Sequence, residues 1–175
     1  MNNVFMWIAL GLVVTLLVFG TGCMMFGSSS RDLPVVKNFD AARFMGVWHE
    51  IARLPQRFEA GLVNVTAAYS LEGDKLRIVN RGFRDGKEKV ATAVGHFAGS
   101  PDEGAFRVSF FRPFYGDYRI LWLSSDYDLA LVTGSDRSYL WILARTPSIP
   151  AERQAALVEH AALLGFDTSK LEYPK

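Results

Sequence analysis

Residues 75–97 have the sequence KLRIVNRGFRDGKEKVATAVGHF, and this stretch decides the fold. In its first part Leu76 and Ile78 alternate with Arg77 and Val79, and Arg81 falls on the same side as Arg77. Side chains two positions apart share one face of a strand, so the alternation separates an inward face from a charged outward one. The tripeptide RDG at 84–86 is a turn signal between two such segments. The stretch therefore predicts two neighbouring antiparallel strands joined by a tight turn.

The same pattern continues along most of the chain. From residue 44 onward, short segments rich in Val, Ile, Phe, Tyr and Trp recur, and clusters of Gly, Asp, Ser and Pro separate them. Regularly spaced short strands with turn residues between them are typical of an antiparallel sandwich or barrel. Eight strands are predicted, at residues 46–54, 64–72, 75–83, 88–98, 105–111, 117–124, 128–134 and 138–145.

The inward face of these strands is predicted to be aromatic. An eight-stranded barrel is just wide enough to be filled by its own side chains or to hold one small ligand. Parity places three polar residues on the inward face too, and one of them, Glu50, would need a partner if buried. The predicted inward aromatic residues are Tyr69, Phe97, Phe106, Phe110, Tyr118, Trp122, Tyr139 and Trp141, and the polar residues are Asn80, Thr133 and Glu50.

A helix is predicted after the last strand, within TPSIPAERQAALVEHAALLGF (146–166). Ser148 is the predicted N-cap, Pro150 lies in the first turn, and Gly165 ends the helix. Leu157, Ala161 and Leu164 share one face and need an apolar wall. We expect the helix to pack outside the barrel, where the outward residues Leu121 and Leu123 supply part of that wall.

Composition limits the function classes. The 175 residues are 50% hydrophobic, which is typical of a globular protein and most simply predicts one domain with one core. Lys and Arg number 19 against 18 Asp and Glu, without a basic cluster, and this balance argues against nucleic-acid binding. Cys23 is the only cysteine, so an internal disulfide is excluded.

The N-terminal segment has the features of an export signal. Residues 1–30 contain no charged side chain, and Val4–Phe19 is a nearly continuous apolar run. The small residues Gly20, Thr21 and Gly22 before Cys23 resemble the site at which a bacterial lipoprotein signal is cut and the cysteine is acylated. We expect a signal peptide at 1–22, an acylated tether at 23–35 and a barrel domain at 36–175; an uncleaved N-terminal helix is the alternative. In many bacterial lipoproteins, Asp directly after the acylated cysteine marks retention in the inner membrane. This chain has Met24 there, which favours the bacterial outer membrane, with the domain facing the periplasm.

Three motifs lie at distinct places among the predicted strands. NFDAARFMGVWHEIAR (38–53) holds the Gly-x-Trp of Gly46 and Trp48, SSDYDLALV (124–132) holds Asp126 and Tyr127, and YLWILARTP (139–147) holds Arg145. In sequence, order and strand position these motifs resemble the three motifs of the lipocalin family. The likeness covers about residues 36–173 and is greatest to the bacterial outer-membrane members. It implies an all-β, eight-stranded antiparallel up-and-down barrel with a C-terminal helix outside.

The motif residues have a structural interpretation. We expect Arg145 to lie over the Trp48 indole where the first and last strands close the barrel, in a cation–π contact worth ~0.5–2 kcal/mol. Gly46 allows a close approach of the backbone. These residues are therefore predicted to stabilise the fold and not to catalyse a reaction.

The cavity composition predicts an elongated apolar ligand with one polar head, such as a fatty acid or a lysophospholipid. Two alternatives are a lipid-processing enzyme that uses the same cavity and a barrel filled by its own aromatic side chains. His49, His96 and His160 lack metal-ligand spacing, a G-x-S-x-G elbow is missing, and neither a metal nor a cofactor is expected. The ligand's head group and the oligomeric state, including a homodimer, stay open. The predicted ligand-binding residues are Tyr69, Asn80, Phe106, Phe110, Tyr118 and Trp141.

Overall fold

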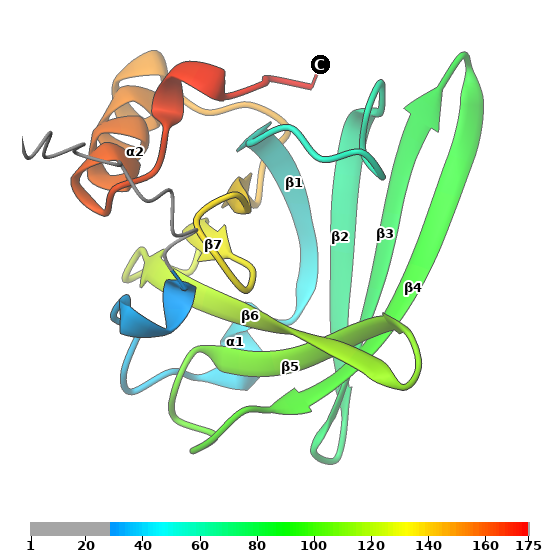
Figure 1. Cartoon of the computed structure of the whole chain (residues 1–175), viewed down its shortest axis with the longest axis vertical. Helices are drawn as coiled ribbons and strands as arrows, with labels where there is room; N and C mark the ends of the chain where they lie inside the picture. The colour runs from blue at the N-terminus through cyan, green and yellow to red at the C-terminus, as the bar shows by residue number, and fades with distance from the viewer. Residues whose placement is uncertain (1–28, 175) are drawn as a thin grey trace, which may run out of the picture.

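The described part of the chain is a closed antiparallel barrel with one long helix outside it (Figure 1). The computed structural model describes residues 29–174, so the predicted signal peptide, Cys23 and the first part of the tether lie outside the described residues. Each strand pairs with the next, and β1 pairs with β8 to close the barrel, which confirms the predicted fold class. The strands are β1 Gly46–Arg53, β2 Val63–Glu72, β3 Lys75–Arg84, β4 Lys87–Phe97, β5 Ala105–Phe111, β6 Phe114–Leu123, β7 Leu129–Thr133 and β8 Leu140–Ala144.

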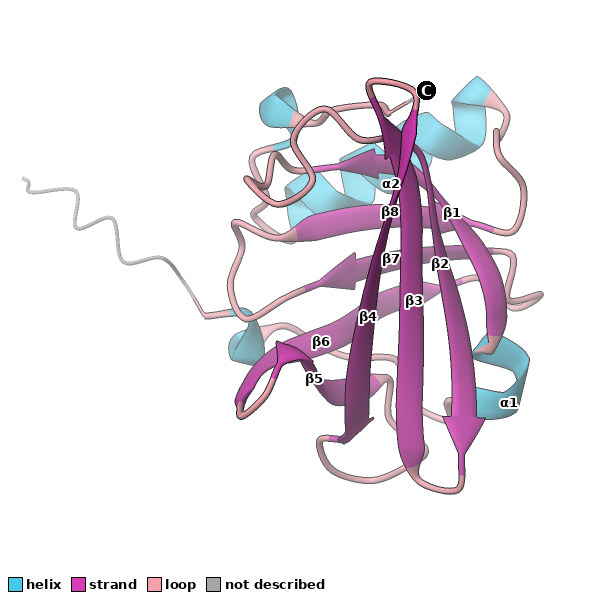
Figure 2. Cartoon of the chain, turned by 90° about the vertical axis from the view of Figure 1, so that its right-hand side faces the viewer, coloured by secondary structure: helices cyan, strands magenta, loops and turns pink. Residues whose placement is uncertain are grey.

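Within residues 29–174, four helical segments flank these strands. The 3-10 turn η1 (Ser30–Asp32) and α1 (Ala41–Phe44) precede β1, and α2 (Ala151–Leu163) and η2 (Thr168–Lys170) follow β8. The Asp40 carboxylate caps α1 by accepting hydrogen bonds from the backbone N–H groups of Ala42 and Arg43. Figure 2 shows α1 at one end of the barrel and α2 against the side formed by β7 and β8.

The predicted start of α2 was wrong. The helix begins at Ala151 with Pro150 as its N-cap and without a side-chain cap, so Ser148 lies outside the helix. A residue that precedes proline avoids the helical conformation, which keeps Ile149 out of the first turn. Gly165 follows the helix with a φ of +85°, a conformation that favours glycine, and it ends the helix as predicted.

The buried residues form two cores instead of the single one predicted. The first fills the barrel and includes Phe44, Trp48 and Phe106. The second lies between α2 and the outer face of the barrel, where Leu157 and Ala161 pack with residues of β7 and β8. The barrel wall is therefore covered by apolar side chains on both faces over β7 and β8, where all five residues of β7 are buried.

A bulge in β6 overturns two predicted orientations. The register shifts between Ile120 and Trp122, so that Ile120 lies opposite Val132 but Trp122 lies opposite Leu131. Trp122 consequently packs in the outer core, with its ring 6.4 Å from that of His160 on α2. Leu123 turns into the barrel. The extra residue reverses the alternation after Leu121, and only Leu121 supplies the outer wall as expected.

Candidate functional site

One end of the barrel is closed by an aromatic cluster around Trp48. Its side chain is fully buried, its ring centroid lies 4.8 Å from that of Phe44, and its Nε1 donates a hydrogen bond to the Phe44 carbonyl oxygen at 2.8 Å. The guanidinium carbon of Arg145 lies 4.0 Å from the Trp48 ring centroid, in the cation–π contact expected from the sequence. The same guanidinium donates hydrogen bonds to backbone carbonyls of Arg43, Phe44, Val47 and Tyr127.

The other motif residues lie at the same closed end. Gly46 has a φ of +98°, and a Cβ there would lie 3.3 Å from Nη1 of Arg145, so glycine suits both the conformation and the space. The Tyr127 hydroxyl accepts a hydrogen bond from the backbone N–H of Asp40 at 2.9 Å, and Arg43 lies over its ring. Asp126 is exposed in the turn between β6 and β7. Their contacts fasten the N-terminal segment to the barrel.

A cavity lies between this closed end and the opposite, open end. Its wall is mainly aliphatic and aromatic with a few polar groups, the composition that is typical of small-molecule sites. Among the residues predicted to contact a ligand, Tyr69, Asn80, Phe110, Tyr118 and Trp141 line it.

Phe106, which was also predicted to bind the ligand, does not line this cavity. It does point into the barrel, but it packs in the closed end, 4.9 Å from the Phe97 ring and 5.9 Å from the Phe39 ring. Alternation along a strand predicts which face a residue occupies and not its depth along the barrel. Phe110, four residues further along β5, is 53% exposed at the open end.

Two tyrosines contribute a neutral polar pair to the cavity. The hydroxyl oxygens of Tyr69 and Tyr118 lie 2.7 Å apart in a hydrogen bond. Burial raises the pKa of both phenols above the ordinary value, so both stay protonated at physiological pH. A third polar group, the side-chain oxygen of Asn80, is buried and has no hydrogen-bond partner among the described residues. It is an acceptor available to a donor on a ligand.

Near the open end, two glutamates and an arginine lie at the edge of the cavity. Arg53 is 2% exposed and donates from Nη1 to Oε1 of Glu50 at 2.8 Å, which provides the partner that a buried Glu50 requires. Its Nε donates to Glu172 at 3.2 Å, and its Nη2 donates to the backbone carbonyls of Glu59 and Leu62. All three nitrogens of the guanidinium are therefore occupied within the chain.

The second glutamate, Glu59, is buried and accepts a hydrogen bond from Nε1 of Trp141 at 3.1 Å. Burial, with the neighbouring Glu59, raises the pKa of Glu50 to about 8 despite the opposing effect of Arg53. Burial also raises the pKa of Glu59. Because two buried carboxyl groups share one arginine, the pair retains a proton near neutral pH.

Three further residues at the cavity, Arg53, Phe58 and Glu59, were not predicted from the sequence. Residues 54–62 form the loop between β1 and β2, and this loop places Phe58 and Glu59 at the cavity. The only sequence signal for the arginine was Glu50 itself, since a buried carboxylate needs a cation and Arg53 is the nearest one along the chain. Nothing in the local pattern indicates that the loop covers the cavity.

Within residues 29–174, no group of three His, Cys, Asp or Glu side chains is arranged to hold a metal ion. Over the same residues, no helix has both the length and the apolar character needed to cross a bilayer.

Thr133, expected in the cavity, instead donates to the carbonyl oxygen of Tyr139 at 2.6 Å within the turn between β7 and β8.

Comparisons with known proteins agree with this architecture. The family model of the lipocalin-like domain matches residues 39–175. The chain is 47% identical over 143 residues to the outer membrane lipoprotein Blc of Escherichia coli strain K12, covering 80% of this chain and 81% of that protein. It is 45% identical to the Blc protein of Citrobacter freundii, with 83% and 84% covered.

More distant similarity extends beyond bacteria. The temperature-induced lipocalin-1 of Arabidopsis thaliana is 35% identical over 154 residues, covering 82% of this chain and 83% of that protein. Among solved structures, insecticyanin from the tobacco hornworm Manduca sexta superimposes with a TM-score of 0.65 at 21% identity, covering 82% and 84% of the two chains. The motif residues at the closed end, the barrel topology and the family match lead to one conclusion: the chain belongs to the lipocalin family.

Proposed function

We propose that this protein is a lipid-anchored lipocalin of the bacterial outer membrane that holds a fatty acid or a lysophospholipid in its barrel. The observation that carries the proposal is the composition of the cavity inside the barrel, which has an apolar wall and a few polar atoms. A site of this composition suits an elongated apolar ligand with one polar head. Holding or carrying the lipid unchanged is the function we favour over lipid processing.

Burial of the acyl chain of such a ligand provides enough free energy for binding. Each buried methylene contributes ~0.8 kcal/mol, so an acyl chain of about a dozen carbons gains roughly 10 kcal/mol before ordering costs. Association and ordering remove at least about 4 kcal/mol, which leaves at most about 6 kcal/mol from the acyl chain, a dissociation constant of about tens of micromolar before the head group contributes. The chain would lie toward Tyr69 and Tyr118. A head group that donates hydrogen bonds, such as the hydroxyl of a lysophospholipid or the protonated carboxyl of a fatty acid, would lie toward the unpaired oxygen of Asn80 and the carboxyl groups of Glu50 and Glu59.

Two findings support the anchor and the location. The relatives from Escherichia coli and Citrobacter freundii are named outer membrane lipoproteins. The small residues before Cys23, the only cysteine, favour the same modification in this chain. The tether after Cys23 would keep the barrel on the periplasmic side.

Native mass spectrometry of the chain isolated with its membrane lipids tests the function. An intact fatty acid or lysophospholipid bound to the barrel supports the carrier. A chemically altered lipid supports the enzyme, and an empty barrel after lipid exposure contradicts both.

A pair of aspartate variants tests the position of the ligand. Tyr118→Asp introduces a charge into the apolar cavity, so it should weaken binding of a fluorescent fatty acid at least tenfold, about 1.4 kcal/mol. Arg77→Asp is the matched control, because Arg77 is exposed on the outer face of β3. Arg107 is a poor control because it forms an ion pair with Asp117. Circular dichroism would establish that both variants are folded. Equal affinities of the two would contradict the proposed site.

A further inference from the structure

The open end of the barrel carries exposed phenylalanines. Phe111 is 77% and Phe114 is 72% exposed at the tip of the hairpin between β5 and β6, and their rings are stacked with 6.5 Å between centroids and 7° between planes. Phe58 and Phe110 are also more than half exposed, and both extend from this rim to the wall of the cavity. Apolar side chains gathered at one place on a surface indicate an interaction site.

Basic side chains outnumber acidic ones near this rim. Arg57, Lys87, Lys89 and Arg112 are exposed on the loops and strand ends of the open end, and the exposed acidic residues there include Asp85 and Glu88, of which Glu88 pairs with Arg81. The turns of the closed end are rich in acidic residues, which include Glu72, Asp74, Asp102, Glu103 and Asp126. Phenylalanines surrounded by basic residues suit a surface that is apolar inside and anionic outside, as a bilayer with acidic lipids is.

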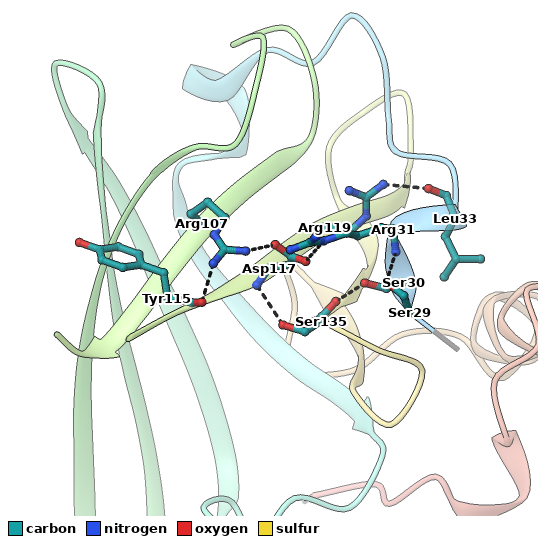
Figure 3. A network of polar contacts seen from close by, with 10 residues as sticks. Ser29, Ser30, Arg31, Leu33, Arg107, Tyr115, Asp117, Arg119 and Ser135 are labelled. Carbon is teal, nitrogen blue, oxygen red and sulfur yellow. Dashed lines mark hydrogen bonds and ion pairs between the residues drawn. The ribbon is translucent and has the colours of Figure 1, made fainter. Parts of the chain in front are cut away.

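The start of the described chain is fastened near the same end (Figure 3). The Ser30 hydroxyl donates to the carbonyl oxygen of Gly134, and the Ser30 N–H donates to that of Ser135 at 3.1 Å, both in the turn between β7 and β8. Arg31 pairs with Asp117 at 2.9 Å, three residues after Phe114 in β6. Asp117 also pairs with Arg107. The start of the described chain is therefore held both by the hydrogen bonds of the buried Ser30 and by the ion pair of Arg31.

The distance from the predicted acyl site then limits the orientation of the barrel. Cys23 lies six residues before Ser29, and six residues span at most about 22 Å. The ten-residue strand β3, which connects the two ends of the barrel, is about 33 Å long. Because barrel strands tilt by roughly 35–45°, it spans about 23–27 Å along the barrel axis, which is still more than the tether can reach. A tether that leaves beside the turn between β7 and β8 therefore keeps the open end nearer the membrane than the closed end.

We propose that the open end of the barrel docks on the lipid bilayer, with Phe111 and Phe114 in its interfacial layer and the flanking basic residues on anionic head groups. This inference rests on the proposed acylation of Cys23. Docked in this way, Phe58 and Phe110 provide an apolar route from the bilayer to the cavity, so a lipid enters the barrel without crossing water.

Depth-dependent quenching of fluorescence tests the orientation in the full chain. An acylated Cys23 is blocked, so a second cysteine is the only reactive thiol. We would label Phe114→Cys at the rim and Asp74→Cys, in the exposed turn between β2 and β3, with the same environment-sensitive dye. In vesicles of phosphatidylethanolamine and phosphatidylglycerol, spin-labelled lipid should quench the dye at 114 at least twofold and leave the dye at 74 unchanged.

The outcomes separate docking from anchoring. Protein that floats with the vesicles while the dye at 114 stays unquenched overturns docking and leaves the anchor intact. Equal quenching at both sites also overturns docking. An unquenched dye at 114 in protein that crosslinks as a dimer overturns it as well, because the rim would then contact a second copy of the chain. Unacylated Cys23 in protein that does not float refutes the anchor, and the docking inference fails with it.

A second experiment measures lipid entry. Phe111 and Phe114 do not line the cavity beside Tyr69 and Tyr118 but only the pocket that adjoins it at the rim, so replacing both with serine should lower the affinity for a fluorescent fatty acid added from solution less than twofold. The rate at which the same lipid moves from vesicles into the barrel should fall at least fivefold. Arg77→Ser, on the outer face of β3, is the control and should keep the wild-type rate. An unchanged transfer rate in the double variant would overturn the role of the rim.

Discussion

Replacing Trp48 with alanine should destabilise the barrel by about 3–5 kcal/mol, the usual cost of removing a fully buried indole. The structure indicates where this free energy comes from. The Phe44 carbonyl that accepts from Trp48 also accepts from Nη2 of Arg145 at 3.1 Å, so it keeps a partner and the lost hydrogen bond adds little. The cation–π contact accounts for ~0.5–2 kcal/mol, and lost packing against Phe44 supplies most of the remainder.

Urea unfolding followed by circular dichroism measures this change. Since a small domain has a total stability of about 5–15 kcal/mol, the alanine variant should unfold at a much lower urea concentration. Trp48→Phe is the matched variant, because it keeps a ring beneath Arg145 and beside Phe44, and its loss should be clearly smaller. Trp48 does not line the cavity, so the folded fraction should keep its ligand affinity. A wild-type midpoint for Trp48→Ala, or equal losses for both variants, would refute the account of the closed end.

Three further predictions concern the buried carboxyl groups, the outer helix and the anchor. In the folded protein the pKa of Glu50 is raised from 4.5 to about 8, so its carboxyl keeps a proton that the unfolded chain releases. The stability that this proton provides is present at low pH and is lost as the pH rises through 8. The free energy of unfolding falls by at most about 1.4 kcal/mol per pH unit. Glu59→Gln removes the neighbouring negative charge, so stability should fall less steeply with pH in this variant. Urea midpoints at several pH values measure the slope. An unchanged slope would contradict the sharing of one proton by Glu50 and Glu59. Leu157→Ala on α2 should cost about 2–5 kcal/mol in thermal or urea unfolding, whereas Leu163→Ala, at an 80% exposed position, should change little. Cys23→Ser should abolish incorporation of a palmitate analogue and leave the N-terminus uncut, and equal labelling of variant and wild type would exclude the anchor.

Alternation along the chain predicts the eight strands because a barrel wall imposes a strict period of two on its side chains. The expected bounds differ from the structure by one or two residues for most strands. The largest difference is in β6, which begins at Phe114 instead of 117 because Phe111 pairs with Phe114 across a tight turn. Turn residues mark a break in the pattern, but they do not fix the last hydrogen-bonded pair.

The cavity residues were predicted less completely, because three of their properties are not periodic. Phe106 and Phe110 have the same parity, yet one packs in the closed end and the other lies at the open rim. Glu59 reaches the cavity from a loop, where no alternation applies. The contact between Arg53 and Glu172 joins residues 119 positions apart, which a local pattern cannot indicate.

The bulge in β1 shows how one strand serves both cores. In β1 the register shifts between Glu50 and Ala52: Glu50 lies opposite Leu143, and Arg53 lies opposite Trp141, both of which line the cavity. Ile51 and Ala52 both belong to the outer core. Strict alternation would turn Arg53 to the outer face and leave Glu50 buried without a cation, at a cost of several kcal/mol. The bulge thus packs two consecutive apolar residues outside and returns the arginine to the glutamate, so the outer core and the polar end of the cavity depend on the same extra residue.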